Sequence, residues 1–584
     1  MTTIGTRRDD QAMIDLVAAR LADAGGEPGG AFHPATVAEL DERDEFPAAA
    51  CRLLTELGLA RWYVPHTHGG ALADYLTLVR LVRLVACRDL TSAVAHAKTF
   101  LGAVAVWVGG SADQAQRLAA RIGDGAVVSW GLTERRHGSD LRASEVTASA
   151  VGDGWRITGE KWLINNATRG DAVCLLARTE PAPRASSGAL SFFLVDRSGL
   201  TRESYRPLPK ERTLGIRGAD ISGFVIDAVV PPEALVGGVG DGLSLSVRCL
   251  QLTRTMCTGL SLGAADQVLR SALAYASERV VSGSRLIELP TVRRTLGETA
   301  ASVLLAEAAS ITAARGVATL TGEQGVAALA VKALVPTLVQ DVVERVGELL
   351  GARGFLTGVH AEGGFAKLER DHRIVGIFDG TTSVCRSGLI AQFPWLARGW
   401  KRRRCDIAGV RAASALHTVP DPPDLAGLSL TPRTGCSQVQ SLPTLVEQVE
   451  RMARTGAVPD SLLRLATSVS VAADRLHHDI AAERPSAAGP PAAAFELAER
   501  YELCYAAASC LSLFCFSERQ PGPRADTLWV RAALAVAVAR LREFDADLAD
   551  PSEPAEEALD ELVAEWRYTQ TVPSWFAADR DGGR

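Results

Sequence analysis

The sequence predicts a mainly α-helical protein with a central antiparallel β domain, and three observations support this fold class. Apolar residues recur at helical spacing in the first 124 residues and again from residue 233. Between them, residues 125–232 contain short β-rich runs bounded by glycine and polar clusters. Hydrophobic residues make up 47% of the 584 residues and aromatic residues only 5%, so Ala, Leu and Val dominate, which suits helices.

Residues 1–124 form the first expected domain, in which Val79–Val85 and Ala112–Ile122 have the apolar spacing of buried helical stripes. The pattern changes at Gly125, and the expected β domain covers residues 125–232. Its strands are predicted at Ala126–Leu132, Glu145–Ser149, Trp155–Thr158, Ala172–Arg178 and Leu190–Val195. Pro231 and Pro232 end this domain, because proline interrupts regular structure.

Residues 233–397 form an expected helical bundle, in which Pro290 suits the first turn of a helix over Thr291–Thr312. A linker is predicted over residues 398–443, where a Pro/Gly/Ser-rich stretch follows the basic run Lys401–Arg404. That run is either a solvated part of the linker or a site for an acidic carrier protein. Residues 444–584 form an expected C-terminal extension with helices at Leu445–Thr455, Ser461–Arg484, Phe495–Ser517 and Asp526–Leu548.

Composition narrows the function classes. The net charge is −6 with both signs well mixed, which argues against nucleic acid or an anionic membrane as a partner. The eleven cysteines form no CxxC pair and are expected to be reduced core residues. The N-terminus lacks the apolar core of a signal peptide, and Leu503–Phe516 is too short to span a bilayer. We therefore expect a cytoplasmic protein with no membrane span.

The segment Arg370–Thr382 (RDHRIVGIFDGTT) is the most informative part of the chain. Its apolar run, Ile374–Phe378, ends in an Asp-Gly-Thr turn that begins at Asp379. A carboxylate at the end of an apolar segment can serve as a general base. In the alternative interpretation, Asp379 merely caps the next helix and Gly380 permits the bend.

This segment resembles the Arg-Asp-x-x-Ile-x-x-Ile-Tyr-Glu-Gly-Thr stretch of the acyl-CoA dehydrogenase family. Five further segments resemble family motifs in the family's order: residues 57–70 (LGLARWYVPHTHGG), 132–140 (LTERRHGSD), 159–166 (GEKWLINN), 214–217 (LGIR) and 351–354 (GARG). The resemblance covers about two-thirds of the chain. It implies a helical domain, a β domain and a four-helix bundle, and some long-chain members carry a comparable C-terminal helical extension.

The resemblance also implies a reaction: the FAD-dependent α,β-dehydrogenation of an acyl thioester. The flavin takes a β-hydride on one face of the substrate, and a carboxylate takes the α-proton on the other. Asp379 stands where the family has its catalytic Glu, and its backbone amide would bind the thioester carbonyl. Arg254 is expected near it. Some relatives place the base on the earlier helix, but that position is Thr253 here.

The remaining site residues follow from the same resemblance. Residues expected to bind FAD are Leu132, Thr133, Ser139, Ile164, Asn165, Arg279, Gly351, Gly354 and Thr381. Residues expected to bind the substrate are Ser139, Arg136, His137 and Gly380. No metal site is expected.

Several positions depart from the family pattern. Asp379 is one methylene shorter than Glu, and Glu348 replaces a Gln of the cofactor turn. The family's Trp-Ile-Thr becomes residues 163–165 (LIN), with Trp162 one place early and therefore expected on the other face of the strand. These departures suggest a specialised substrate in secondary metabolism, on CoA or a carrier protein. Expected partners are a second copy of the chain, as a homodimer, and an electron acceptor such as an electron-transfer flavoprotein. A flavin monooxygenase and a non-catalytic scaffold remain alternatives.

Overall fold

The computed structural model describes residues 3–180, 189–484, 489–517 and 527–576. The chain forms two compact units. Unit 1 comprises Met1–Met256 with Asp424–Leu430, and unit 2 comprises Cys257–Pro423 with Thr431–Arg584. The expected helical bundle and C-terminal extension thus fall mostly within the same unit.

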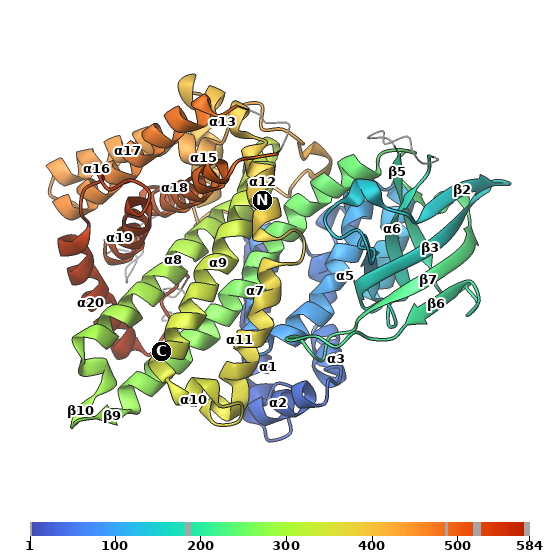
Figure 1. The fold of residues 1–584 in the computed structure, drawn as a ribbon, viewed down its shortest axis with the longest axis horizontal. Helices are drawn as coiled ribbons and strands as arrows, with labels where there is room; N and C mark the ends of the chain where they lie inside the picture. The colour runs from blue at the N-terminus through green and yellow to red at the C-terminus, as the bar shows by residue number, and fades with distance from the viewer. Residues whose placement is uncertain (1–2, 181–188, 485–488, 518–526, 577–584) are drawn as a thin grey trace. The chain divides into compact units, whose positions relative to one another are not determined.

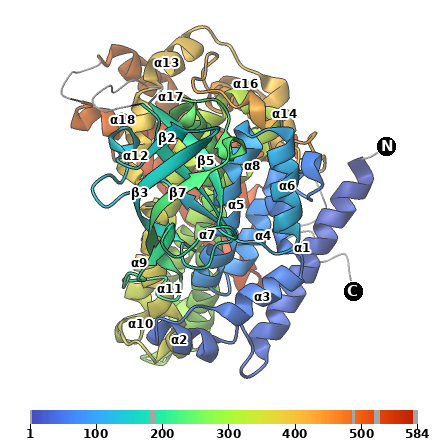
Figure 2. The same cartoon turned by 90° about the vertical axis from the view of Figure 1, so that its right-hand side faces the viewer.

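Unit 1 begins with helices, as predicted. These are α1 (Thr3–Gly26), α2 (Pro34–Glu42), α3 (Ala48–Glu56), α4 (Tyr75–Ala86), α5 (Leu90–Gly109) and α6 (Ala112–Gly123). Side chains satisfy the first amide groups of several of them: Asp89 caps α5, and Ser111 forms a capping box with Gln114 on α6. The apolar helix α5 lies beside the sheet (Figure 2) and packs against β1 (Val128–Gly131).

The sheet of unit 1 has eight strands in the order β6-β7-β3-β2-β4-β5-β8, with β1 paired to β4. The other strands are β2 (Thr147–Val151), β3 (Gly154–Asn165), β4 (Ala172–Arg178), β5 (Leu190–Asp196), β6 (Tyr205–Leu208), β7 (Ile221–Val230) and β8 (Leu235–Val236). The predicted sheet was antiparallel, but β4 pairs with both β1 and β2 in parallel, so the sheet is mixed. A parallel pair needs a long connection, and β1 reaches β4 only after β2 and β3.

A long helix, α7 (Gly242–Glu278), begins in unit 1 and ends in unit 2. The hairpin β9 (Val280–Val281) and β10 (Ser284–Arg285) then leads into α8 (Pro290–Thr319), and α9 is Gln324–Leu350. Pro290 occupies the first turn of α8 as predicted, although the helix continues past Thr312. Figure 1 shows α8 and α9 side by side. The short helices α10 (Ala352–Phe355), α11 (Gly364–His372) and α12 (Thr382–Ile390) follow.

The extension is helical, as predicted. It contains α16 (Leu442–Arg454), α17 (Asp460–Ala482), α18 (Ala492–Phe516), α19 (Leu528–Arg542) and α20 (Ser552–Thr569), and it is preceded by α13 (Phe393–Lys401), α14 (Ile407–Ser414) and α15 (Ser437–Gln440). The expected linker is therefore partly helical, since α14 and α15 lie within it. The expected start of the last predicted helix, Asp526, lies outside the described residues.

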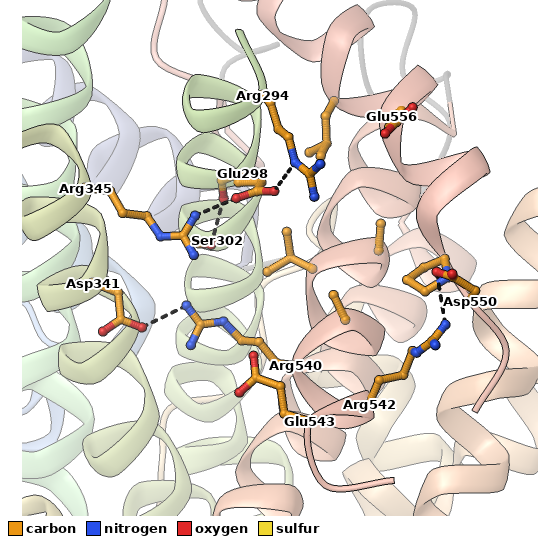
Figure 3. A pocket seen from close by; sticks show the side chains of 15 residues that line it. Arg294, Glu298, Ser302, Asp341, Arg345, Arg540, Arg542, Glu543, Asp550 and Glu556 are labelled. Carbon is orange, nitrogen blue, oxygen red and sulfur yellow. Dashed lines mark hydrogen bonds and ion pairs between the residues drawn. The ribbon is translucent and has the colours of Figure 1, made fainter. Parts of the chain in front are cut away.

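The extension is joined to the bundle by ion pairs around a pocket of about 480 Å³ (Figure 3). On one side, Arg540 of α19 pairs with Asp341 of α9 at 2.8 Å. Glu298 of α8 binds both Arg294 and Arg345. Arg542 pairs with Asp550 at 3.0 Å. Each arginine that lines the pocket therefore has a carboxylate partner, and the Arg540–Asp341 pair joins α19 to α9.

Among the described residues, three helices are long and apolar enough, by length and composition, to cross a membrane. They are Leu90–Gly109, Pro290–Thr319 and Thr321–Leu350, so Leu503–Phe516 is not the only long apolar stretch among the described residues. Their most apolar windows are 83%, 100% and 83% buried inside the structure. The apolar side chains of these helices therefore lie largely in the protein interior.

Candidate functional site

The predicted Asp-Gly-Thr turn connects two helices of unit 2. After α11, a short 3-10 helix (Arg373–Gly376) leads into the turn, and α12 begins at Thr382. Asp379 has φ +55° and Gly380 has φ +102°, both in the left-handed region. Asp379 does not cap α12: the hydroxyl of Thr381 accepts the Val384 amide at 3.2 Å. The capping alternative is therefore wrong, because the cap is two residues later.

The Asp379 carboxylate is half-buried and has a hydrogen-bond donor from a distant part of the chain. The thiol of Cys257, on α7, donates to Oδ2 of Asp379 at 3.2 Å. Cys257 itself is buried. This contact joins residues 122 positions apart, and no sequence pattern indicated it.

A buried lysine holds the backbone on both sides of Asp379. The ammonium group of Lys332, on α9, donates to the carbonyl oxygens of Val375 at 2.7 Å and Gly380 at 3.1 Å. Its side chain is fully buried, and its ammonium lies 5.8 Å from the centre of the Phe378 ring. The sequence analysis missed Lys332. A charged residue at an apolar position of a helix was the only available signal.

A buried histidine is the last residue of α11, just before the 3-10 helix that leads into the turn. His372 contacts the Ser261 hydroxyl and the Gln340 side-chain oxygen, both at 3.0 Å. Burial, together with the charge of Lys332, lowers the pKa of His372 to about 3. The imidazole is therefore neutral at physiological pH and connects α11 to α7 and α9.

The residues expected at the FAD phosphates occupy turns and helix ends of unit 2. Gly351 has φ +58° and ψ −136°, a conformation that essentially only glycine adopts. At Gly354 a Cβ would lie 3.1 Å from the Leu350 side chain and 3.3 Å from the Gly347 carbonyl. Arg279 is exposed at the end of α7. The two glycines thus have a conformational and a steric reason to be glycine.

The loop predicted to contact the flavin ring lies in unit 1, between β1 and β2. Lys161, fully buried on β3, donates to the Leu132 carbonyl at 3.1 Å and to Glu134 at 2.8 Å. The Thr133 carbonyl accepts the Trp162 amide at 3.0 Å. Burial lowers the pKa of Lys161 to about 8, although Glu134 opposes this shift. The buried ion pair fixes the main chain around Leu132 and Thr133.

The remainder of this loop faces solvent. Arg136 and Ser139 are exposed, and His137 contacts Glu145 at 3.2 Å. Arg135 pairs with Glu160 and stacks over the Trp162 ring at 4.6 Å. Unlike Arg135, Arg136 forms no ion pair with a described residue.

Strand β3 is irregular where the flavin is expected. Trp162 and Ile164 pair with the consecutive residues Gly223 and Ser222, so Leu163, with φ +57°, is the extra residue of a bulge. The alternation of side chains between the two faces of a regular strand therefore does not hold at Trp162. The Ile164 side chain is 2% exposed in the apolar core, so its main chain is the part left for a ligand.

Two buried polar groups of unit 1 fit a bound flavin. Both amide atoms of Asn165 are buried and have no hydrogen-bond partner among the described residues. The indole N–H of Trp130, on β1, is also buried and has no hydrogen-bond partner among the described residues. Buried polar groups are normally paired, so an unpaired amide next to the bulge suits a ligand with ring nitrogens and carbonyls. The residues present therefore fit FAD, and Trp130 is a candidate that the sequence analysis missed.

Arg254 lies on the part of α7 that belongs to unit 1 and is 8% exposed. Thr253 beside it is fully buried. Its hydroxyl has no hydrogen-bond partner among the described residues.

In the part of the chain that the structure describes, one group of side chains has metal-ligand geometry. Ligand atoms of Glu134, His137 and Glu145 lie within 4.8 Å of one another. Glu134 is already bound by Lys161, Ser144 and two main-chain amides. Both carboxylate oxygens of Glu134 thus already accept hydrogen bonds from protein groups.

A helical domain, a mixed sheet and a helical unit with a carboxylate turn, together with the unpaired polar groups beside the β3 bulge, fit a flavin-binding oxidoreductase. Three family models cover most of the chain: the acyl-CoA dehydrogenase N-terminal domain matches residues 10–126, the middle domain 129–229 and the C-terminal domain 240–393. The chain belongs to the acyl-CoA dehydrogenase family and is an oxidoreductase whose cofactor is FAD.

Individual relatives are distant. The chain is 28% identical to "Probable acyl-CoA dehydrogenase FadE25" of Mycobacterium tuberculosis over 351 residues, which cover 60% of this chain and 88% of the relative. An acyl-CoA dehydrogenase of Bacillus anthracis, solved with FAD, shares the fold over 96% of both chains, with TM-score 0.68 and 17% identity. The prolyl acyl carrier protein oxidase AnaB matches 66% of this chain and 98% of its own, with TM-score 0.59 and 18% identity.

Proposed function

We propose that the protein catalyses the α,β-dehydrogenation of an acyl thioester, with Asp379 as the base that removes the α-proton. The half-buried Asp379 carboxylate, fixed by Cys257 and placed on a turn held by Lys332, carries this proposal. A general base must be presented in a fixed direction to the proton that it takes. Asp379 accepts the proton on its carboxylate, and its main-chain amide donates to the thioester carbonyl, which gains negative charge.

FAD, when bound, supplies the acceptor for the β-hydride. Asn165, Thr133 and the main chain at Leu132 and Ile164 would hold the ring. Gly351, Gly354, Arg279, Thr381 and Ser139 would hold the remainder of the cofactor, and Arg254 would assist at the reacting centre. The orphaned Asn165 amide and the glycine-specific geometry at Gly351 support this assignment.

The thioester arm would approach the exposed loop of Arg136, His137 and Ser139, while Gly380 borders the reacting carbon. Exposure of Arg136 supports this placement, because a guanidinium suits a phosphate of CoA or of a carrier's pantetheine arm. AnaB acts on a carrier-bound prolyl group, and a carrier-bound substrate of secondary metabolism is the one we favour here. We further propose a cytoplasmic location and an electron-transfer flavoprotein as electron acceptor.

The test uses the purified, yellow holoprotein without oxygen. Saturated acyl thioesters on CoA and on a carrier protein should bleach the flavin absorbance. Asp379→Asn should retain FAD and lose at least ~100-fold in bleaching rate, because positioned base catalysis contributes about that much. Wild-type bleaching in the variant would refute the assigned base.

Two other outcomes would favour other functions. A colourless protein that takes up no FAD would favour a scaffold. A yellow protein that ignores thioesters but consumes oxygen with an amine or aromatic compound would favour a monooxygenase.

A further inference from the structure

We propose that Cys257 and Lys332 are positioning residues for Asp379: Cys257 fixes the direction of its carboxylate, and Lys332 fixes the turn that carries it. This inference rests on the proposed role of Asp379 as the base. All three residues belong to unit 2 and come from α7, α9 and the turn before α12.

The thiol acts on the side chain. Cys257 donates to Oδ2 of Asp379 at 3.2 Å, from a helix that is buried at this position. A carboxylate oxygen that accepts a hydrogen bond from a buried group loses rotational freedom about its side-chain bonds. Asp379 is one methylene shorter than the glutamate of the family motif, so an error in its direction cannot be corrected by a longer side chain.

The ammonium group acts on the main chain. Lys332 binds the carbonyl oxygens of Val375 and Gly380, which lie on either side of Asp379 in the sequence. Asp379 has φ +55°, a conformation that is disfavoured for a residue with a Cβ and persists only where surrounding structure enforces it. Opening the turn would remove two acceptors from a fully buried ammonium, so Lys332 enforces the closed conformation.

The two contacts are complementary. Lys332 determines where the Asp379 Cα lies and which way its Cβ points, and Cys257 determines where the carboxylate lies relative to that Cβ. Since misplacement by ~1 Å can lower a rate ~100-fold, loss of either contact should slow proton removal without weakening substrate binding equally.

The experiment measures proton removal without oxidation. An acyl thioester with no hydrogen on its β-carbon is bound to the holoprotein in D2O, and deuterium uptake at the α-carbon is followed by mass spectrometry. Cys257→Ala should slow uptake fivefold to tenfold, because about one hydrogen bond to the base is lost. Cys257→Ser, which keeps a donor, should restore most of the rate. Neither variant should change the Kd of the thioester more than about twofold.

Lys332→Met removes the ammonium but keeps a long side chain that suits a helix. It should slow uptake by about tenfold or more. Lys332→Gln, which keeps one donor, should take up deuterium at a rate between those of the Lys332→Met variant and the wild type. This variant provides the test if Lys332→Met does not fold.

Lys367→Met is the matched control. Lys367 is also buried in unit 2, but it pairs with Asp371 at 2.5 Å on its own helix. This variant should lose stability yet exchange the α-proton at the wild-type rate, which separates positioning from general destabilisation.

Two results have distinct meanings. If Asp379→Asn abolishes exchange while Cys257→Ala and Lys332→Met exchange at the wild-type rate, the positioning roles are wrong and the proposed function stands. If Asp379→Asn itself exchanges normally, the assignment of the base fails.

Discussion

At the residue scale, the candidate site depends on unusual local conformations. Asp379, Leu163 and Gly351 all have positive φ, and each lies at a position assigned to the base or the flavin, or next to one. Such conformations cost free energy and are retained where function or close packing requires them. The Asp379 turn, the Leu163 bulge and the Gly351 turn are therefore positions where regular secondary structure is interrupted at the candidate site.

His372 gives a pH dependence at this scale. Its pKa, about 3 when folded, lies below the ordinary value of 6.5 that applies in the unfolded chain. Between these values the unfolded state binds more protons, so the stabilising effect is complete above pH 6.5 and is lost as pH falls. At pH 5 the loss should be about 2 kcal/mol, measured by urea unfolding of the holoprotein. His372→Gln should flatten this part of the pH curve; an unchanged slope would contradict the assignment.

At the element scale, α12 is attached to the extension by an ion pair. Arg386 of α12 binds Glu502 of α18 through two hydrogen bonds of 3.0 and 3.1 Å, and Glu499 at 2.8 Å. Glu502 is fully buried. Burial raises the pKa of Glu502, and the two hydrogen bonds from Arg386 oppose that shift, so the geometry indicates an ionic pair at neutral pH.

Removing Glu502 should be costly. Glu502→Ala leaves the Arg386 charge with much less compensation in a buried position and should lower the free energy of unfolding by about 3–5 kcal/mol. Glu499→Ala is the control. Its side chain is 37% exposed, so its loss should cost about 1 kcal/mol or less. Denaturant unfolding of both variants measures the difference, and equal small losses would show that the buried pair is unimportant.

Element positions could be predicted from sequence to different degrees. The strand Ala172–Arg178 was predicted with its observed bounds because it is an uninterrupted apolar run between polar turns. β7 was missed because Gly223 and Asp227 break its pattern, and α20 was missed because glutamates dominate it. Asp379 could be predicted because the motif around it is local. Cys257 and Lys332 could not be predicted, because their contacts join residues that are 122 and 48 positions apart in the sequence.

At the scale of the whole molecule, unit 2 exposes apolar side chains where a second copy could bind. Val280 and Val281 of the β9 hairpin are 54% and 41% exposed, and Phe355 at the end of α10 is 88% exposed. Arg279 precedes the hairpin and is also exposed. We propose that these exposed apolar side chains, next to a residue assigned to the cofactor, form the interface of the expected homodimer.

The homodimer can be tested by light scattering after size-exclusion chromatography, which should give twice the mass of the chain. Phe355→Ser combined with Val281→Ser should shift the protein toward the monomer and reduce its FAD content. Val471→Ser, at a partly exposed position on α17, is the control and should leave mass and FAD content unchanged. A double variant that stays dimeric would exclude this face as the interface.

The pairing of Arg386 with Glu502 has a consequence for truncated forms of the chain. A protein that stopped after α13 would retain the arginine on α12 but lose both of its carboxylate partners. The cut end would thus leave an uncompensated cation one and a half helical turns beyond the Asp-Gly-Thr turn. Proteolytic removal of about the last 180 residues should therefore disturb α12, the helix that follows Asp379, as well as shorten the chain.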